Sequence, residues 1–171
     1  MNESSNRILI LALGNDIMGD DAAGLIAARE LKKEFSKEVD IFEVSSAGLA
    51  LIDILEGYKR VLILDSIPCS SKADCSIREL KKEDLSKQYS YSPHYVGLPE
   101  IIELAVRLGI RFPYEIKALV IEIKEKGIIR EGLSEETKMR LPILIQRASK
   151  MIKEWLGDEY YFEWQDEIEA P

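Results

Sequence analysis

The sequence is poor in the residues that bind metals most tightly: among 171 residues it has one histidine, His94, and two cysteines, Cys69 and Cys75. A metalloprotease helix that holds zinc through two histidines is therefore excluded. A structural zinc site or a disulfide framework would need more thiols or histidines than these. We interpret the two cysteines, six positions apart, as ordinary loop thiols, with a redox-sensitive disulfide as the alternative.

Positive charge and long apolar runs are also scarce. The chain has 23 Lys and Arg against 31 Asp and Glu, a formal net charge of −8. This balance disfavours nucleic acids and anionic membrane surfaces as partners, because both attract basic faces. No apolar run approaches the roughly 18 residues that span a bilayer, and the polar start of the chain does not resemble a signal peptide. We expect a cytoplasmic protein that neither binds nucleic acid nor inserts into a membrane.

Short apolar runs alternate with amphipathic stretches along the chain. The runs typical of strands lie at 7–13, 39–44, 60–65 and 115–123, with a weaker edge strand at 74–80. The helical patterns lie at 21–35, 47–55, 98–108 and 134–156, the last with a kink at Pro142. This alternation predicts a three-layer α/β/α sandwich on a mostly parallel sheet. We expect a single domain over residues 1–157, followed by an acidic tail with interleaved aromatic residues over 158–171.

Three candidate functional features follow predicted strands. Ligands of open α/β sheets bind beyond the carboxyl ends of the parallel strands. Asp21 lies in the glycine-bearing loop after the first strand, Asp65 ends the third strand, and His94 lies in a later loop. Two carboxylates and an imidazole suit a first-row divalent ion. The structural alternatives are that one acid of the pair Asp20 and Asp21 interacts with a helix dipole, and that Asp65 and His94 stabilise turns.

Two other kinds of site fit these residues less well. Gly14, Gly19 and Gly24 are five positions apart, which matches neither a dinucleotide fingerprint nor a P-loop. Acids at the start of the following helix would also repel a pyrophosphate. A Ser-His-Asp triad ranks low, because the Ser45-Ser46-Ala47-Gly48 segment is no Gly-x-Ser-x-Gly elbow.

Four spaced motifs resemble those of the hydrogenase maturation endopeptidases, which process the large subunit of nickel–iron hydrogenases. The motifs are Gly14-Asn15 with Asp20-Asp21-Ala22-Ala23-Gly24, Ala47-Gly48, Leu64-Asp65, and Ser92-Pro93-His94 with Gly97-Leu98. They run in order over roughly the whole chain up to the last helix. Ala22 stands where many members have glycine, and Asp21 where either Asp or Glu is seen. The acidic tail lies outside the shared pattern.

The resemblance implies a five-stranded twisted sheet in which one strand runs against the others. It implies that Asp21, Asp65 and His94 are the catalytic side chains and contact nickel, and that Glu43 is an accessory acid at the rim. The nickel belongs to the substrate, a hydrogenase large-subunit precursor, so no permanent cofactor is expected. The implied activity is removal of the precursor's C-terminal extension after nickel insertion. The alternative is a non-enzymatic, nickel-sensing module that binds the precursor.

A weak set of ligands suits such a role. Two carboxylates and one imidazole, without thiolates, complete the coordination of an incoming nickel ion but do not retain one of their own. Cleavage then becomes a check on metal insertion, which a tightly held resident metal would defeat. We expect Asp21, Asp65 and His94 to converge around one exposed crevice, with Glu43 on the same edge of the sheet.

Overall fold

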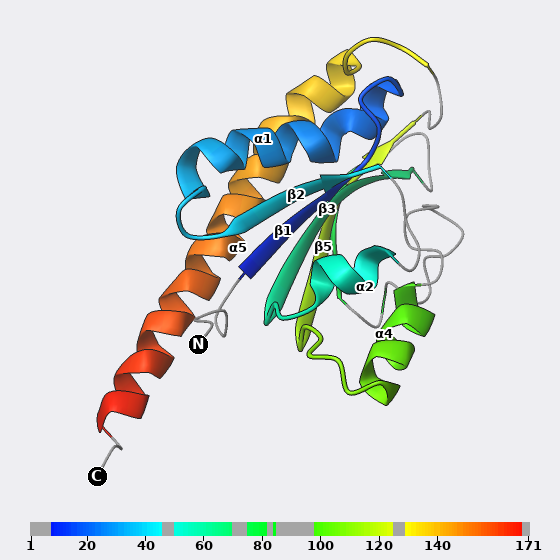
Figure 1. The fold of residues 1–171 in the computed structure, drawn as a ribbon. Helices are drawn as coiled ribbons and strands as arrows, with labels where there is room; N and C mark the ends of the chain where they lie inside the picture. The colour runs from blue at the N-terminus through cyan, green and yellow to red at the C-terminus, as the bar shows by residue number, and fades with distance from the viewer. Residues whose placement is uncertain are drawn as a thin grey trace.

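The computed structural model describes residues 8–45, 50–69, 75–81, 84, 98–124 and 129–168. Its centre is a sheet of five strands in the order β2-β1-β3-β5-β4 (Figure 1). The strands are β1 (Ile8–Leu13), β2 (Asp40–Val44), β3 (Arg60–Pro68), β4 (Ile77–Lys81) and β5 (Glu115–Ile123). β4 is antiparallel to β5, and the other neighbours are parallel. The predicted five-stranded, mostly parallel sheet with one antiparallel strand is confirmed.

Helices cover both faces of this sheet (Figure 1). One face carries α1 (Ala23–Phe35) and α5 (Glu135–Ile168), and the other carries α2 (Ala50–Leu55) and α4 (Leu98–Arg107). The buried apolar residues accordingly form two clusters. Ile8 and Ile10 of β1 pack with residues of α1 and α5, whereas Leu9 and Leu11 pack with α2. A strand whose residues alternate between two cores is apolar throughout, which explains the continuous run and confirms the three-layer sandwich.

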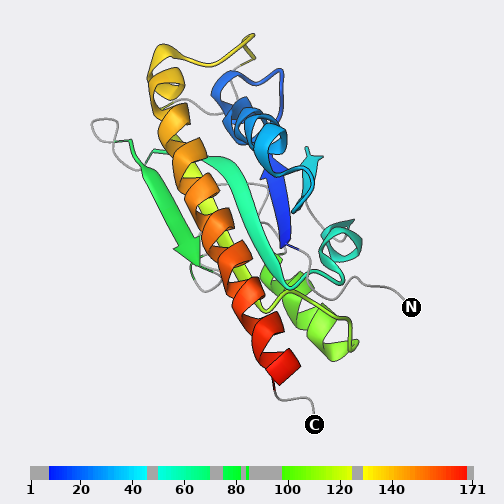
Figure 2. The same cartoon turned by 90° about the vertical axis from the view of Figure 1, so that its left-hand side faces the viewer.

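Two elements extend further than their sequence patterns indicate. The third strand was predicted to end at Asp65, but β3 pairs with β5 as far as Pro68 opposite Ile123. The last helix was predicted to end near residue 156, but α5 continues through Gly157 to Ile168 with Pro142 inside it. Figure 2 shows α5 running along one face of the sheet and beyond it. Residues 158–168 therefore prolong this helix, and the division of the chain at residue 157 stays a prediction.

The helices of the described segments would need about 20 consecutive apolar residues to cross a bilayer. Although α5 has 34 residues, none of these helices is apolar over a sufficient length to span a membrane.

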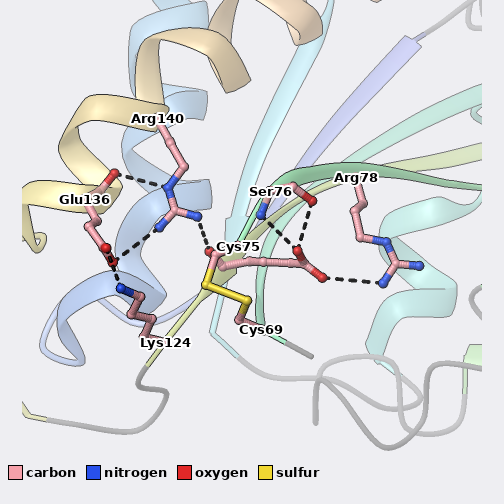
Figure 3. The surroundings of a disulfide bond; sticks show 8 residues. Cys69, Cys75, Ser76, Arg78, Lys124, Glu136 and Arg140 are labelled. Atoms are coloured by element: carbon pink, nitrogen blue, oxygen red, sulfur yellow. Dashed lines mark hydrogen bonds and ion pairs between the residues drawn. A yellow bond between two sulfur atoms is a disulfide. The ribbon is translucent and has the colours of Figure 1, made fainter. Parts of the chain in front are cut away.

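The interpretation of the two cysteines as free thiols is wrong, because Cys69 and Cys75 form a disulfide with a Cα–Cα distance of 5.3 Å. Both flank the same end of β5. The backbone N–H of Cys69 donates to the carbonyl of Ile123 at 2.8 Å. The N–H and hydroxyl of Ser76 each donate to the Glu122 carboxylate at 2.9 Å (Figure 3). The disulfide thus links the strands on either side of β5, a pairing that depends on the strand order.

Candidate functional site

The candidate site lies where β1 ends beside β3. β1 pairs with β3 only as far as Ala12 opposite Leu64, whereas β3 continues along β5 to Pro68. From β1 the chain passes through α1 to β2 on one side, and β3 lies on the other side. The strand order therefore reverses between β1 and β3, and open α/β sheets bind ligands at such a point. We call the point where β1 ends beside β3 the step between these strands. Asp65 is the first residue of β3 beyond it.

Two glycines bring the loop after β1 close to the step. Gly14 has a φ of +151°, and a Cβ there would overlap the carbonyl oxygen of Asp21. A Cβ on Gly24 would lie 2.6 Å from the carbonyl oxygen of Leu64 and 2.9 Å from that of Leu13. The start of α1 therefore packs directly on the ends of β1 and β3. The short 3-10 helix η1 (Gly19–Ala22), which precedes α1, holds Asp21 beside β3.

Asp21 and Asp65 both form hydrogen bonds with Ser66. The Ser66 hydroxyl donates to Asp21 Oδ1 at 2.8 Å, and the Ser66 backbone N–H donates to Asp65 Oδ1 at 2.7 Å. Asp21 is 3% exposed, while Asp65 and Ser66 are fully buried. The structure thus connects two of the predicted site residues to the same serine, although they come from separate elements. Their contact with nickel stays a prediction.

His94, with its neighbours Ser92 and Pro93, lies outside the described residues. Within the described segments, no three His, Cys, Asp or Glu side chains form a group that could hold a metal ion. The convergence of Asp21, Asp65 and His94 around one crevice therefore stays a prediction.

Asp20 has a different role from its neighbour Asp21. Its buried carboxylate accepts hydrogen bonds from the N–H of Ser134 at 2.6 Å and from the Ser134 hydroxyl at 2.7 Å. It also pairs with Arg130 at 3.3 Å. Ser134 precedes α5 and accepts a hydrogen bond from the N–H of Thr137 at 3.3 Å, as an N-cap does. One acid of the pair thus stabilises a helix start, but the helix is α5 rather than α1.

Glu43 lies on the same sheet edge but faces α1. It stands opposite Ala12 in the register of β1 and β2, and Ala12 belongs to the core cluster beneath α1. Arg29 of α1 donates to the Glu43 carboxylate at 2.6–3.2 Å and to both oxygens of Asp16 at 2.8 Å. The hydrogen bonds from Arg29 lower the pKa of Asp16, and those to Asp16 and Glu43 raise the pKa of Arg29. An accessory role for Glu43 stays a prediction.

Sequence reasoning missed Ser66 and Arg29. Ser66 had a usable signal, because it directly follows a candidate acid at the predicted end of an apolar strand. Arg29 had none, since a charged residue on an amphipathic helix is ordinary and its partners lie on two other segments.

The fold and site define an α/β protein with two buried carboxylates, each bonded to Ser66, at the reversal point of its sheet. A family model described as HycI, hydrogenase maturation protease, matches residues 26–151. The chain therefore belongs to the hydrogenase maturation protease family and is a peptide-bond hydrolase. This confirms the resemblance found in the sequence. Because the family is one of proteases, the alternative of a non-enzymatic binding module is wrong.

Individual relatives agree with this assignment. The hydrogenase 2 maturation protease of Escherichia coli K12 is 27% identical over 131 residues, covering 74% of this chain and 75% of that protein. The nickel–iron hydrogenase maturation protease HybD from Thermococcus kodakarensis is 30% identical with a TM-score of 0.67, covering 85% of this chain and 98% of that one. The structure of the E. coli endopeptidase HybD, 21% identical, shares the fold with a TM-score of 0.74 over 86% of this chain and 93% of its own.

Proposed function

We propose that this protease removes the C-terminal extension of a nickel–iron hydrogenase large-subunit precursor after nickel insertion, with the precursor's nickel as the recognition element. The observation that carries this proposal is the pair of buried carboxylates, Asp21 and Asp65, that share Ser66 beside the step between β1 and β3. The family assignment supplies the reaction class.

The electrostatics of this pair favour an incoming cation. A buried carboxylate has lost part of its hydration, and a bound cation offsets the cost of that burial. Carboxylate oxygens suit hard ions, and the imidazole of His94 is the donor in the proposed set that suits borderline nickel. Without thiolates the set binds weakly, so the ion is supplied by the precursor rather than retained by the protease.

The same arrangement suits peptide hydrolysis. A nickel ion carried on the precursor acts as a Lewis acid beside the scissile carbonyl or a water molecule. One of the two carboxylates would serve as general base, a contribution typically worth about 10²–10⁴-fold in rate. Recognition and chemistry would thus use the same two side chains.

The test is mass spectrometry of a nickel-loaded large-subunit precursor incubated with the full chain. We expect the precursor to lose its C-terminal extension, and Asp65→Asn to lower the rate by at least about 100-fold. Asp53→Asn, which changes an exposed acid on α2, is the matched control and should cleave as wild type. A precursor that binds the wild-type chain stably without losing residues would contradict the proposal.

The expected cytoplasmic location stays a prediction.

A further inference from the structure

Ser66 forms a hydrogen bond with each of the two candidate carboxylates. Its hydroxyl donates to Asp21 Oδ1 at 2.8 Å, and its backbone N–H donates to Asp65 Oδ1 at 2.7 Å. The first contact joins β3 to η1, and the second lies within β3. Ser66 is fully buried, so these bonds form away from competing water. The proposed cleavage reaction gives the Ser66 hydroxyl no role of its own.

The position of Ser66 in β3 explains why its side chain makes the contact with Asp21. Successive residues of a strand point to opposite faces of the sheet. Asp65 is in register with Val120, which belongs to the core beneath α2. Ser66 is in register with Ile121, which belongs to the core beneath α1 and α5. Ser66 therefore faces the side of the sheet that carries Asp21, and Asp65 does not.

We propose that Ser66 is a positioning residue that orients the Asp21 carboxylate toward the nickel of the precursor; this inference rests on the proposed function. A hydrogen bond to one oxygen of a carboxylate fixes the rotation of the group, and thereby the direction in which its other oxygen lies. Removing a group that orients a metal ligand in this way typically lowers metal affinity or activity about 10–100-fold. Ser66 acts through Asp21 and does not itself touch the ion.

The chain offers a matched control for this hydrogen bond. The Ser76 hydroxyl donates to the buried carboxylate of Glu122 at 2.9 Å. The hydroxyl donor, the carboxylate acceptor and the distance resemble those of Ser66 and Asp21, although Ser76 is exposed and Ser66 is buried. This second pair lies beside the disulfide at the end of β5 (Figure 3). Removing either hydroxyl deprives a buried carboxylate of one donor, but only Ser66→Ala alters a carboxylate of the candidate site.

The first experiment compares cleavage of the nickel-loaded precursor by wild type, Ser66→Ala and Ser76→Ala, with thermal unfolding of each full-length protein. We expect kcat/KM to fall about 10–100-fold in Ser66→Ala and to stay at the wild-type value in Ser76→Ala. Ser66→Thr keeps the hydroxyl and should retain most of the wild-type rate. If Ser66→Ala does not fold, Ser66→Cys, whose thiol is a weaker donor of similar shape, replaces it with the same expected direction.

The second experiment tests whether Ser66 acts through Asp21. A double-mutant cycle measures the Kd of the nickel-loaded precursor, since coupled residues are not additive. Ser66→Ala should weaken binding in the wild-type background and change nothing in the Asp21→Ala background. A merely structural role would weaken binding equally in both backgrounds.

The outcomes separate this inference from the function on which it rests. If wild type leaves the precursor intact, the proposed function is wrong and the inference falls with it. If wild type cleaves and Ser66→Ala cleaves equally well, or no worse than Ser76→Ala, only the inference is overturned. A selective loss in Ser66→Ala that disappears in the Asp21→Ala background supports it.

Discussion

Adjacent residues of the same type can have unrelated roles, as Asp20 and Asp21 show. Both lie in η1 and both are buried. Asp20 accepts its hydrogen bonds from Ser134 at the start of α5, and Asp21 accepts one from Ser66 in β3. A motif of two acids therefore contains one residue that holds the fold together and one that belongs to the candidate site.

This difference predicts opposite phenotypes for the two amide substitutions. Asp20→Asn weakens two short hydrogen bonds to the start of α5 and should cost about 1–3 kcal/mol of unfolding free energy, with processing retained below the unfolding midpoint. Asp21→Asn removes a negative charge from the site and should abolish processing while the unfolding midpoint changes less. Chemical denaturation and precursor cleavage, measured on both variants, check this. Loss of activity in a folded Asp20→Asn variant, with Asp21→Asn active, would reverse the assignment.

The ion pair of Asp16 with Arg29 gives a stability effect that depends on pH. Because Arg29 lowers the pKa of Asp16 in the folded protein, the pair stabilises the fold above the ordinary carboxyl pKa of about 3.9. That stabilisation is lost as the pH falls through the lowered pKa. We expect the difference in thermal midpoint between wild type and Asp16→Asn to be largest near neutral pH and to shrink as the pH falls below the ordinary carboxyl pKa. A difference that grew as the pH fell would contradict the pairing.

At the scale of elements, the contact of α1 with the strand ends depends on Gly24. A Cβ at this position meets two backbone carbonyls at 2.6 and 2.9 Å, which cannot move like a flexible side chain. Gly24→Ala should therefore destabilise the protein by about 1–3 kcal/mol. It should also lower processing, because it displaces η1 and Asp21 from β3.

Gly157 provides the matched control. It lies inside α5 with nothing within 4 Å of a Cβ, so Gly157→Ala should stabilise the helix by up to about 1 kcal/mol. Denaturation curves of the two variants test the contrast. Equal stability of Gly24→Ala and wild type would show that α1 does not depend on this close approach.

The sequence pattern predicted the elements well and their ends less well. Apolar runs located all five strands, and β5 has the predicted bounds of Glu115 and Ile123. The end of β3 was missed because Ser66 and Pro68 interrupt its apolar pattern, whereas pairing with β5 extends the strand past them. Tertiary pairing, which no local pattern contains, decides such boundaries.

The candidate site was only partly predictable for a similar reason. Asp21 and Asp65 were found because each follows or ends an apolar run, and the strand ends of a parallel sheet meet at one edge. The contacts of Ser66 with both of them, and of Arg29 with Glu43, depend on which face of the sheet each side chain occupies. The face follows from the register, and the register is known only once the strands are paired.

At the scale of the whole molecule, the disulfide ties together the two strands that flank β5. It closes a loop of six positions between Cys69 and Cys75, and such a short loop predicts a stabilisation of about 2 kcal/mol. We expect Cys69→Ser with Cys75→Ser to lower the unfolding free energy by that amount relative to the oxidised wild type. Adding reductant to wild type should lower the unfolding free energy by the same amount. Adding it to the double variant should change nothing. If reductant also lowered the unfolding free energy of the double variant, its effect on wild type would not come from this disulfide alone.

Recognition of the precursor through its nickel is the main step of the proposed function. It is tested most directly by the cleavage rates of one large-subunit precursor, prepared with and without nickel, using wild type and His94→Ala in parallel with thermal unfolding. We expect wild type to cleave the nickel-loaded precursor and to leave the nickel-free precursor intact, and we expect folded His94→Ala to cleave neither. Equal cleavage of both precursors by wild type, or normal cleavage of the loaded one by folded His94→Ala, would contradict it.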